Sequence, residues 1–120
     1  MTTGDTTPNI TKEEAQRLLS DSRAKIDSLD RKIVDLLNQR TLMVEDIGRA
    51  KTALGTPVLE PRREENVFRN VMLHNHGPIS NEALKCVFEQ IMKEMRALQG
   101  MKREPETTSE PKPEAAPEQK

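Results

Sequence analysis

The sequence is poor in aromatic residues and in cysteine. Its 120 residues include two Phe, no Tyr and no Trp, and Cys86 is the one cysteine. So few aromatic side chains exclude an aromatic-filled core and a stacking surface for single-stranded nucleic acid. A lone cysteine excludes a disulfide framework and a cysteine-rich zinc site. We expect Cys86 to be a small, buried apolar residue.

The sequence also lacks an excess of charge of either sign. Nineteen Lys and Arg residues are balanced by twenty Asp and Glu, which gives a formal net charge of −1. This balance creates no field that would attract DNA, RNA or an anionic membrane surface. No apolar run approaches the ~20 residues of a membrane span, and the first residues have no signal-peptide pattern. We therefore expect a cytoplasmic protein without nucleic-acid or membrane partners.

Composition changes at both ends of the chain. Residues 103–120 contain four of the eight prolines and almost no apolar side chains, which is typical of a disordered Pro/Glu-rich tail. Residues 1–10 are expected to form a flexible N-terminus. One folded domain over residues 11–102 remains.

Residues 11–102 show the pattern of three helices, so we predict an all-α fold. The first begins at Thr11, whose Thr-x-x-Glu spacing is typical of a capping box, and continues to about Leu54. The second begins at Pro61, because proline suits a first helical turn. Ser80 is a good N-cap for the third, which ends near Gly100.

The long first helix carries an apolar stripe at steps of mostly three and four residues. At 1.5 Å per residue its roughly 43 residues would extend about 65 Å, more than two shorter helices of the same chain can cover. The sequence therefore predicts an intertwined helical homodimer. A plain coiled coil is the alternative. The stripe consists of Leu19, Ile26, Leu29, Ile33, Leu36, Met43, Ile47, Ala50 and Leu54.

Cationic residues interrupt or flank this stripe. Arg40 lies within it, where an unpaired cation is costly, and Lys51 lies eleven residues later on nearly the same face. Together they could hold a small anion from both ends, although a salt-bridged Arg40 and a lysine at a helix C-terminus are the simpler interpretations. Arg23 is roughly 25 Å from Arg40 along the axis, so it is either a surface residue or part of a partner subunit's site.

Other chemical signals are few. Gln99 projects near the inner face of the third helix, and a buried Gln needs hydrogen-bond partners. His74 and His76 have no further ligand at suitable spacing, so we expect no metal. A nucleophile paired with a base, a glycine-rich phosphate loop and a cofactor fingerprint are all missing, so we expect no cofactor. These residues suit a small polyanion and a reaction without covalent catalysis.

Six segments match the pattern of one known family: residues 23–30, 36–40 and 47–51 in the first helix, Pro57-Val58 and Arg62-Arg63-Glu64 at the second, and Phe88 to Gln99 in the third. Together they resemble the all-helical chorismate mutases over about residues 15–100. In this family, three-helix chains form an intertwined dimer. The resemblance implies an isomerase that converts chorismate to prephenate in phenylalanine and tyrosine biosynthesis.

The resemblance also implies roles for the cationic and amide side chains. Arg40, with Arg23 contributed by the other subunit, would hold the two carboxylates of chorismate. Lys51 would donate to the ether oxygen and to a carboxylate. Gln99 would donate to the ether oxygen from the other side. Lys51, Gln99 and Arg40 are thus the implied catalytic residues.

The second helix would bind the ring hydroxyl of the substrate. Glu64 would accept its hydrogen bond with help from the backbone of Glu60, and Arg63 would lie beside the hydroxyl and order the acidic residues. Glu60 replaces a common Asp. Met95 stands where some members have a small polar residue, so we expect weaker carboxylate contact there.

Three other functions are compatible with the sequence. An isochorismate-pyruvate lyase has a similar fold and a similar cationic pocket. A non-catalytic module could sense prephenate or chorismate for regulation. A dimerising helical scaffold would tolerate loss of Arg40 and Lys51.

Overall fold

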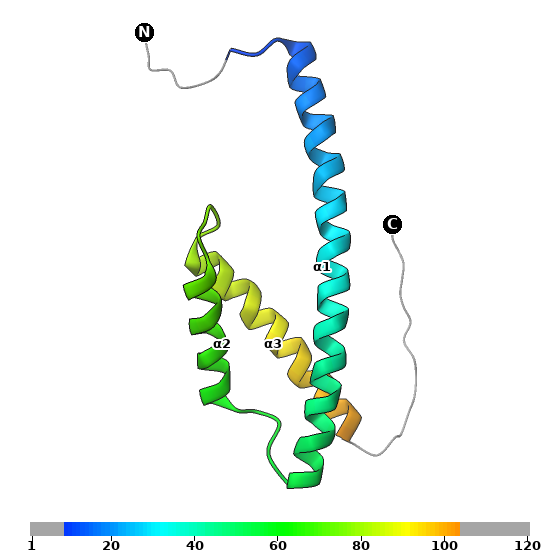
Figure 1. Cartoon of the computed structure of the whole chain (residues 1–120), viewed down its shortest axis with the longest axis vertical. Helices are drawn as coiled ribbons and strands as arrows, with labels where there is room; N and C mark the ends of the chain where they lie inside the picture. Colours follow the sequence, from blue (N-terminus) through cyan, green and yellow to red (C-terminus); the bar gives the residue numbers. More distant parts are fainter. Residues whose placement is uncertain (1–8, 104–120) are drawn as a thin grey trace. The chain divides into compact units, whose positions relative to one another are not determined.

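The computed structural model describes residues 9–103, with side chains to residue 100, and has the predicted all-α architecture (Figure 1). Its helices are α1 (Lys12–Leu54), α2 (Pro61–His74) and α3 (Asn81–Arg103). The predicted flexible N-terminus and Pro/Glu-rich tail lie outside the described residues, apart from residues 9, 10 and 103. None of the helices in the described part has the length and apolar character needed to cross a membrane.

The chain divides into two units, the first ending at Arg40 and the second beginning at Thr41. The first unit contains the start of α1, where the predicted capping box is confirmed. The backbone N–H of Glu14 donates to Thr11 Oγ1 at 3.0 Å, and the backbone N–H of Thr11 donates to Glu14 Oε1 at 3.0 Å. Two N–H groups that the helix leaves without an internal partner are thereby satisfied.

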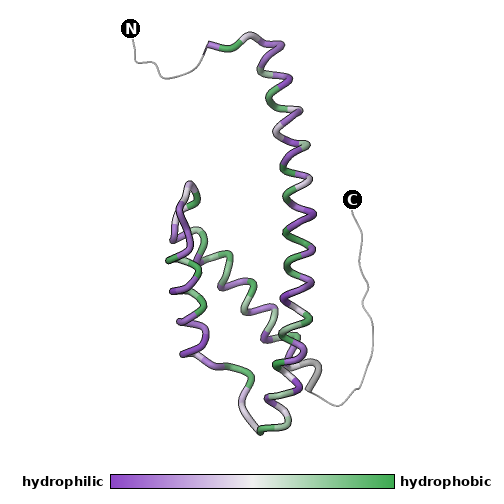
Figure 2. Tube along the Cα trace, in the orientation of Figure 1, coloured by the Kyte–Doolittle hydropathy of each residue, from purple (hydrophilic) through white to green (hydrophobic). Residues whose placement is uncertain are grey.

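The first unit leaves its apolar side chains exposed. Apolar and polar residues alternate along α1 with helical spacing (Figure 2). Ile26, Leu29 and Ile33 are each more than half exposed, as are several neighbours. These apolar residues of the first unit are therefore exposed in the described part of the chain. The stripe residues Leu19 and Leu36 are also exposed, as are Leu18 and Val34 beside the stripe.

In the second unit, α2 and α3 form a helical hairpin (Figure 1). Ser80 caps α3 as predicted, because its Oγ accepts a hydrogen bond from the backbone N–H of Ala83 at 3.0 Å. Asn75 Nδ2 donates to the backbone oxygen of Ile79 at 2.9 Å and ties the turn together. Lys85 Nζ lies 5.4 Å from the centre of the Phe68 ring and links the two helices.

The last turns of α1 bury a different face from the predicted stripe. Val44, Gly48 and Lys51 are buried, whereas the stripe residues Met43 and Ile47 are 56% and 44% exposed. The side chains of successive helix residues point in directions 100° apart around the helix axis. Adjacent residues therefore face different neighbours. On the buried face, Gly48 lies against Gln99 of α3 and Lys51 contacts Val58 and Glu60, whereas the stripe residues Met43 and Ile47 remain exposed.

Cys86 is exposed, and its expected burial is wrong. Leu84 and Phe88 lie four residues apart and are partly buried. Cys86 lies midway between them, about 200° around the helix from each, so it points away from that face.

Candidate functional site

The end of α1 places Lys51 inside the second unit. Gly55, with φ of 70°, ends the helix in the left-handed conformation that glycine adopts without strain. The backbone N–H of Thr56 then bonds to the oxygen of Lys51 at 2.9 Å and reverses the chain. Residues 55–60 consequently pass back alongside the Lys51 side chain.

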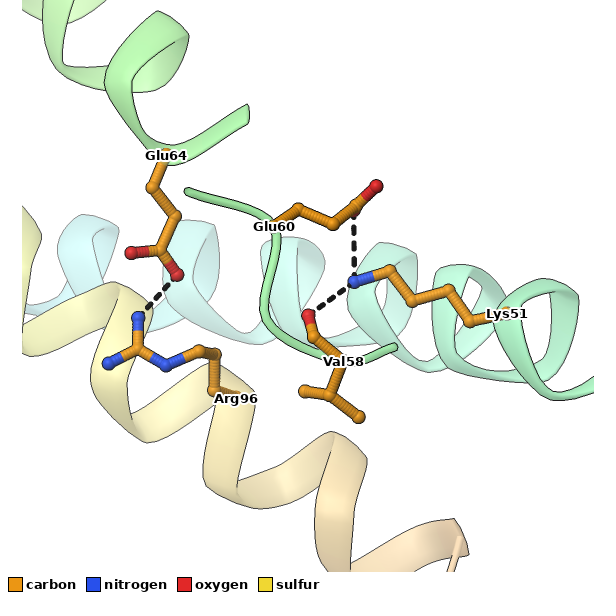
Figure 3. A network of polar contacts seen from close by, with 5 residues as sticks. All are labelled: Lys51, Val58, Glu60, Glu64 and Arg96. Atoms are coloured by element: carbon orange, nitrogen blue, oxygen red, sulfur yellow. Dashed lines mark hydrogen bonds and ion pairs between the residues drawn. The ribbon is translucent and has the colours of Figure 1, made fainter. Parts of the chain in front are cut away.

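Lys51 is one of the most buried charged residues in the described part of the chain, with 7% of its surface exposed. Its Nζ donates to the backbone oxygen of Val58 at 2.6 Å and lies 3.0 Å from Glu60 Oε1 (Figure 3). A buried ammonium needs such partners, because burial alone strongly disfavours an unpaired charge. Its head group is therefore held in one place.

Glu60 contacts Lys51 through its side chain. It is the N-cap of α2, followed by Pro61, and makes no side-chain capping bond. Its carboxylate instead pairs with Lys51. The resemblance implied that the backbone of Glu60 supports Glu64, and the side-chain contact of Glu60 with Lys51 was not predicted.

Glu64, in the first turn of α2, points toward Arg96 on α3 (Figure 3). Arg96 Nη1 donates to Glu64 Oε2, and the two side chains are 33% and 23% exposed. Sequence reasoning did not include Arg96. The available signal was a charged residue four positions after Met92 and three before Gln99, at the edge of the inner face of α3.

That inner face also carries Met95 and Gln99, both buried. Met95 Sδ accepts a hydrogen bond from Thr41 Oγ1 at 3.5 Å. Gln99 lies against Gly48, where an added Cβ would be 3.7 Å from Gln99 Cγ. Gln99 Oε1 is buried and has no hydrogen-bond partner among the residues that the structure describes.

A cavity of about 600 Å³ opens between the end of α1 and α3. Its lining includes Gln99 and the α1 residues Gly48 and Thr52, but not Lys51. The cavity is large enough for a small organic molecule. The other lining residues are Val44, Glu45, Arg49, Ala53 and Leu98.

The remaining predicted site residues are three arginines. Arg63 is exposed on α2, beside Glu64. Arg40 is partly buried and Arg23 is exposed, and both belong to the first unit. The second unit therefore brings together Lys51 with Glu60, while the participation of the two α1 arginines stays a prediction.

The described part of the second unit thus provides two fixed cations and the amide of Gln99, and in it we find no nucleophile paired with a base. Lys51 and Arg96 carry two positive charges, and their carboxylate partners carry two negative charges. Among the described residues, no three His, Cys, Asp or Glu side chains gather as a metal site. Such a set can bind and polarise oxygen atoms of a ligand through hydrogen bonds and charge.

Comparison with known proteins adds sequence and structural relatives. The family model described as "Chorismate mutase type II" matches residues 22–100. A chorismate mutase of Methanocaldococcus jannaschii is 30% identical over 83 residues, which cover 68% of this chain and 83% of that protein. The chain also matches the bifunctional chorismate mutase/prephenate dehydratase of Pseudomonas aeruginosa, at 39% identity over 82 residues, but spans only 22% of its length.

Solved structures of chorismate mutases are also similar to this chain. Chorismate mutase (Form II) from Thermus thermophilus is 33% identical with a TM-score of 0.67, covering 68% of this chain and 93% of that one. Chorismate mutase from Helicobacter pylori in complex with prephenate is 27% identical with a TM-score of 0.65, covering 70% and 91%. Both likenesses agree with the all-α fold.

Proposed function

This chain belongs to the chorismate mutase type II family, and from this premise we propose that it is an isomerase that converts chorismate to prephenate. In this pericyclic rearrangement a C–O bond breaks while a C–C bond forms within one molecule. The protein has to hold the chair-like conformer and stabilise negative charge that develops on the ether oxygen. The observation that carries the proposal is Lys51, a buried ammonium group fixed beside the loop that precedes α2.

Lys51 retains capacity for a ligand. An ammonium group has three N–H donors, and Val58 and Glu60 account for two of them. We assign the third to the ether oxygen and an adjacent carboxylate of chorismate. Because its partners already fix the head group, little reorganisation is needed when charge develops.

Gln99 would donate to the same ether oxygen from the other side. Its buried Oε1 lacks a partner within the described residues, and buried polar atoms are normally satisfied by protein, water or ligand. Rotation of the amide by 180° exchanges its oxygen and NH₂ group. A rotated Gln99 would present a donor where Oε1 now lies.

Binding of the two substrate carboxylates requires further cations. In the second unit, the charges of Lys51 and Arg96 are cancelled by Glu60 and Glu64. We propose that Arg40 supplies one further cation and that Arg23 of a second copy supplies another.

The uncovered stripe of the first unit supports this homodimer. Exposed apolar area of this extent is unusual in a monomer and typical of an interaction surface. The stripe belongs to α1, the helix that also carries Arg23 and Arg40.

The ring hydroxyl of chorismate would bind at the start of α2. Glu64 would accept its hydrogen bond, supported by the backbone at Glu60, with Arg63 nearby. Met95 is buried and contacts Thr41, so we expect it to form an apolar wall. A cytoplasmic location is also part of the proposal and rests on the sequence alone.

Purified protein mixed with chorismate tests this function directly. We expect loss of chorismate and formation of prephenate by the wild type, and a drop in kcat/KM of about 10²–10³ for Lys51→Ala because a fixed donor is removed. Circular dichroism and sedimentation should show the variant folded and of unchanged oligomeric state.

Parallel assays with isochorismate separate the alternatives. Pyruvate release from isochorismate without prephenate formation from chorismate would replace the proposal with a lyase. A folded wild type that turns over neither compound would contradict catalysis. Equal turnover by Lys51→Ala would contradict the role given to Lys51.

A further inference from the structure

The ion pair between Arg96 and Glu64 joins two helices. The residues are thirty-two positions apart, and Arg96 Nη1 donates to Glu64 Oε2 across the space between α3 and α2 (Figure 3). Both side chains are partly buried, at 33% and 23% exposure. The pair therefore fixes how the Glu64 carboxylate is oriented.

Arg96 lies at the edge of the inner face of α3. At 100° per residue it is about 40° from Met92 and about 60° from Gln99, and both of these are buried. A charged residue at such a position loses part of its hydration and needs an anionic partner. Its position places it beside the residues assigned to substrate, away from the outer surface of the helix.

We propose that Arg96 is a positioning residue for substrate binding, an assignment that rests on the proposed function. Oε2 of Glu64 is bonded to Arg96. Oε1 makes no hydrogen bond or ion pair with the residues that the structure describes, so it can accept the hydrogen bond of the ring hydroxyl. Holding the carboxylate in one orientation removes an entropy cost on binding. Arg96 also offsets the negative charge of Glu64, which would otherwise repel a substrate that carries two carboxylates.

This role differs from a contribution to stability alone. Ion pairs with this degree of exposure usually contribute little to the free energy of unfolding. An uncompensated carboxylate next to an anionic ligand, in contrast, weakens binding of that ligand specifically. KM is therefore the quantity that should respond, since Arg96 does not contact the bonds that break and form.

The test compares the kinetics of Arg96→Met with those of the wild type on chorismate. Methionine keeps much of the side-chain length and removes the charge. We expect KM to rise roughly fivefold to tenfold with kcat changed by less than about twofold. Arg96→Lys should recover part of the lost affinity because it keeps the charge without the planar guanidinium.

A double-mutant cycle separates charge compensation from packing. In a Glu64→Gln background no carboxylate remains to be neutralised, so Arg96→Met should raise KM by a smaller factor than in the wild type. Arg69→Met is the matched control, because Arg69 is exposed on α2 and donates to Asn66 of the same helix. Its kinetic constants should equal those of the wild type.

The outcomes distinguish this inference from the proposed function. An active wild type combined with an unchanged KM for Arg96→Met, or equal effects of Arg96→Met and Arg69→Met, would overturn the role of Arg96 and leave the mutase activity standing. A wild type without turnover would overturn both. If Arg96→Met does not fold by circular dichroism, Arg96→Lys decides: a raised KM at wild-type kcat supports the role, and wild-type KM overturns it.

Discussion

The side chain of Gln99 gives the sharpest test of the proposed hydrogen bond to the ether oxygen. An amide donates at any pH, whereas a carboxyl donates only when it is protonated. Gln99→Glu should therefore be active mainly at acidic pH, with kcat/KM falling as pH rises and the carboxyl ionises. Because position 99 is buried, the pKa of this carboxyl should lie above the ordinary Glu value of about 4.3. The measurement is kcat/KM for chorismate from about pH 4.5 to 8.

Gln90→Glu is the matched control for this experiment. Gln90 is exposed on α3 and donates to Glu94 of the same helix at 2.7 Å. Its pH profile should follow that of the wild type. A profile for Gln99→Glu that is also indistinguishable from the wild type would show that Gln99 does not donate to the reacting oxygen.

The sequence indicated which residue types the site needs but not how they pair. Lys51 and Gln99 were identified as polar groups near inner helix faces, and both are buried. The side-chain contact of Glu60 with Lys51 and the bond from Arg96 to Glu64 were missed. Helical periodicity specifies which residues share a face of one helix. It does not specify which long side chains from different helices meet.

The helices themselves could be predicted closely because each has strong end signals. The capping box at Thr11, the proline at the start of α2 and the cap at Ser80 are all present in the structure. α3 continues to Arg103, slightly beyond the predicted end near Gly100. A glycine that does not adopt a left-handed conformation is only a weak signal for the end of a helix. The end of α3 was therefore the helix boundary that the sequence predicted least well.

Two glycines at the end of α1 should respond oppositely to alanine. Gly48 is inside the helix, and an added Cβ would meet Gln99 Cγ at 3.7 Å, an ordinary contact. Gly48→Ala should therefore raise the free energy of unfolding by about 0.5–1 kcal/mol. Gly55 has φ of 70°, so Gly55→Ala should lower it by about 1 kcal/mol. Urea denaturation at fixed protein concentration measures both.

The two substitutions are expected to change the free energy of unfolding in opposite directions, so each tests a separate feature of the structure. Destabilisation by Gly48→Ala would show that α1 and α3 approach more closely than the structure indicates. An unchanged stability for Gly55→Ala would show that the turn after α1 does not need a left-handed residue.

For the protein as a whole, the sequence anticipated that one chain does not cover its own apolar surface. The exposed stripe of the first unit agrees with that expectation. The second unit buries only a narrow face of α1, and the buried apolar residues in its described part are Val44, Met92 and Met95. So small a core makes a second copy a natural source of stability as well as of a site residue.

The central claim, that two copies of this chain build a site for chorismate, is tested most directly by complementation. Arg23→Ala and Lys51→Ala should each be nearly inactive alone, because every site then lacks a cation. Co-refolding equal amounts from denaturant gives half heterodimers, each with one intact site of two, so about a quarter of wild-type activity should return. Each variant refolded alone is the control. A mixture no more active than its parents, or a fully active Arg23→Ala, would contradict the shared site.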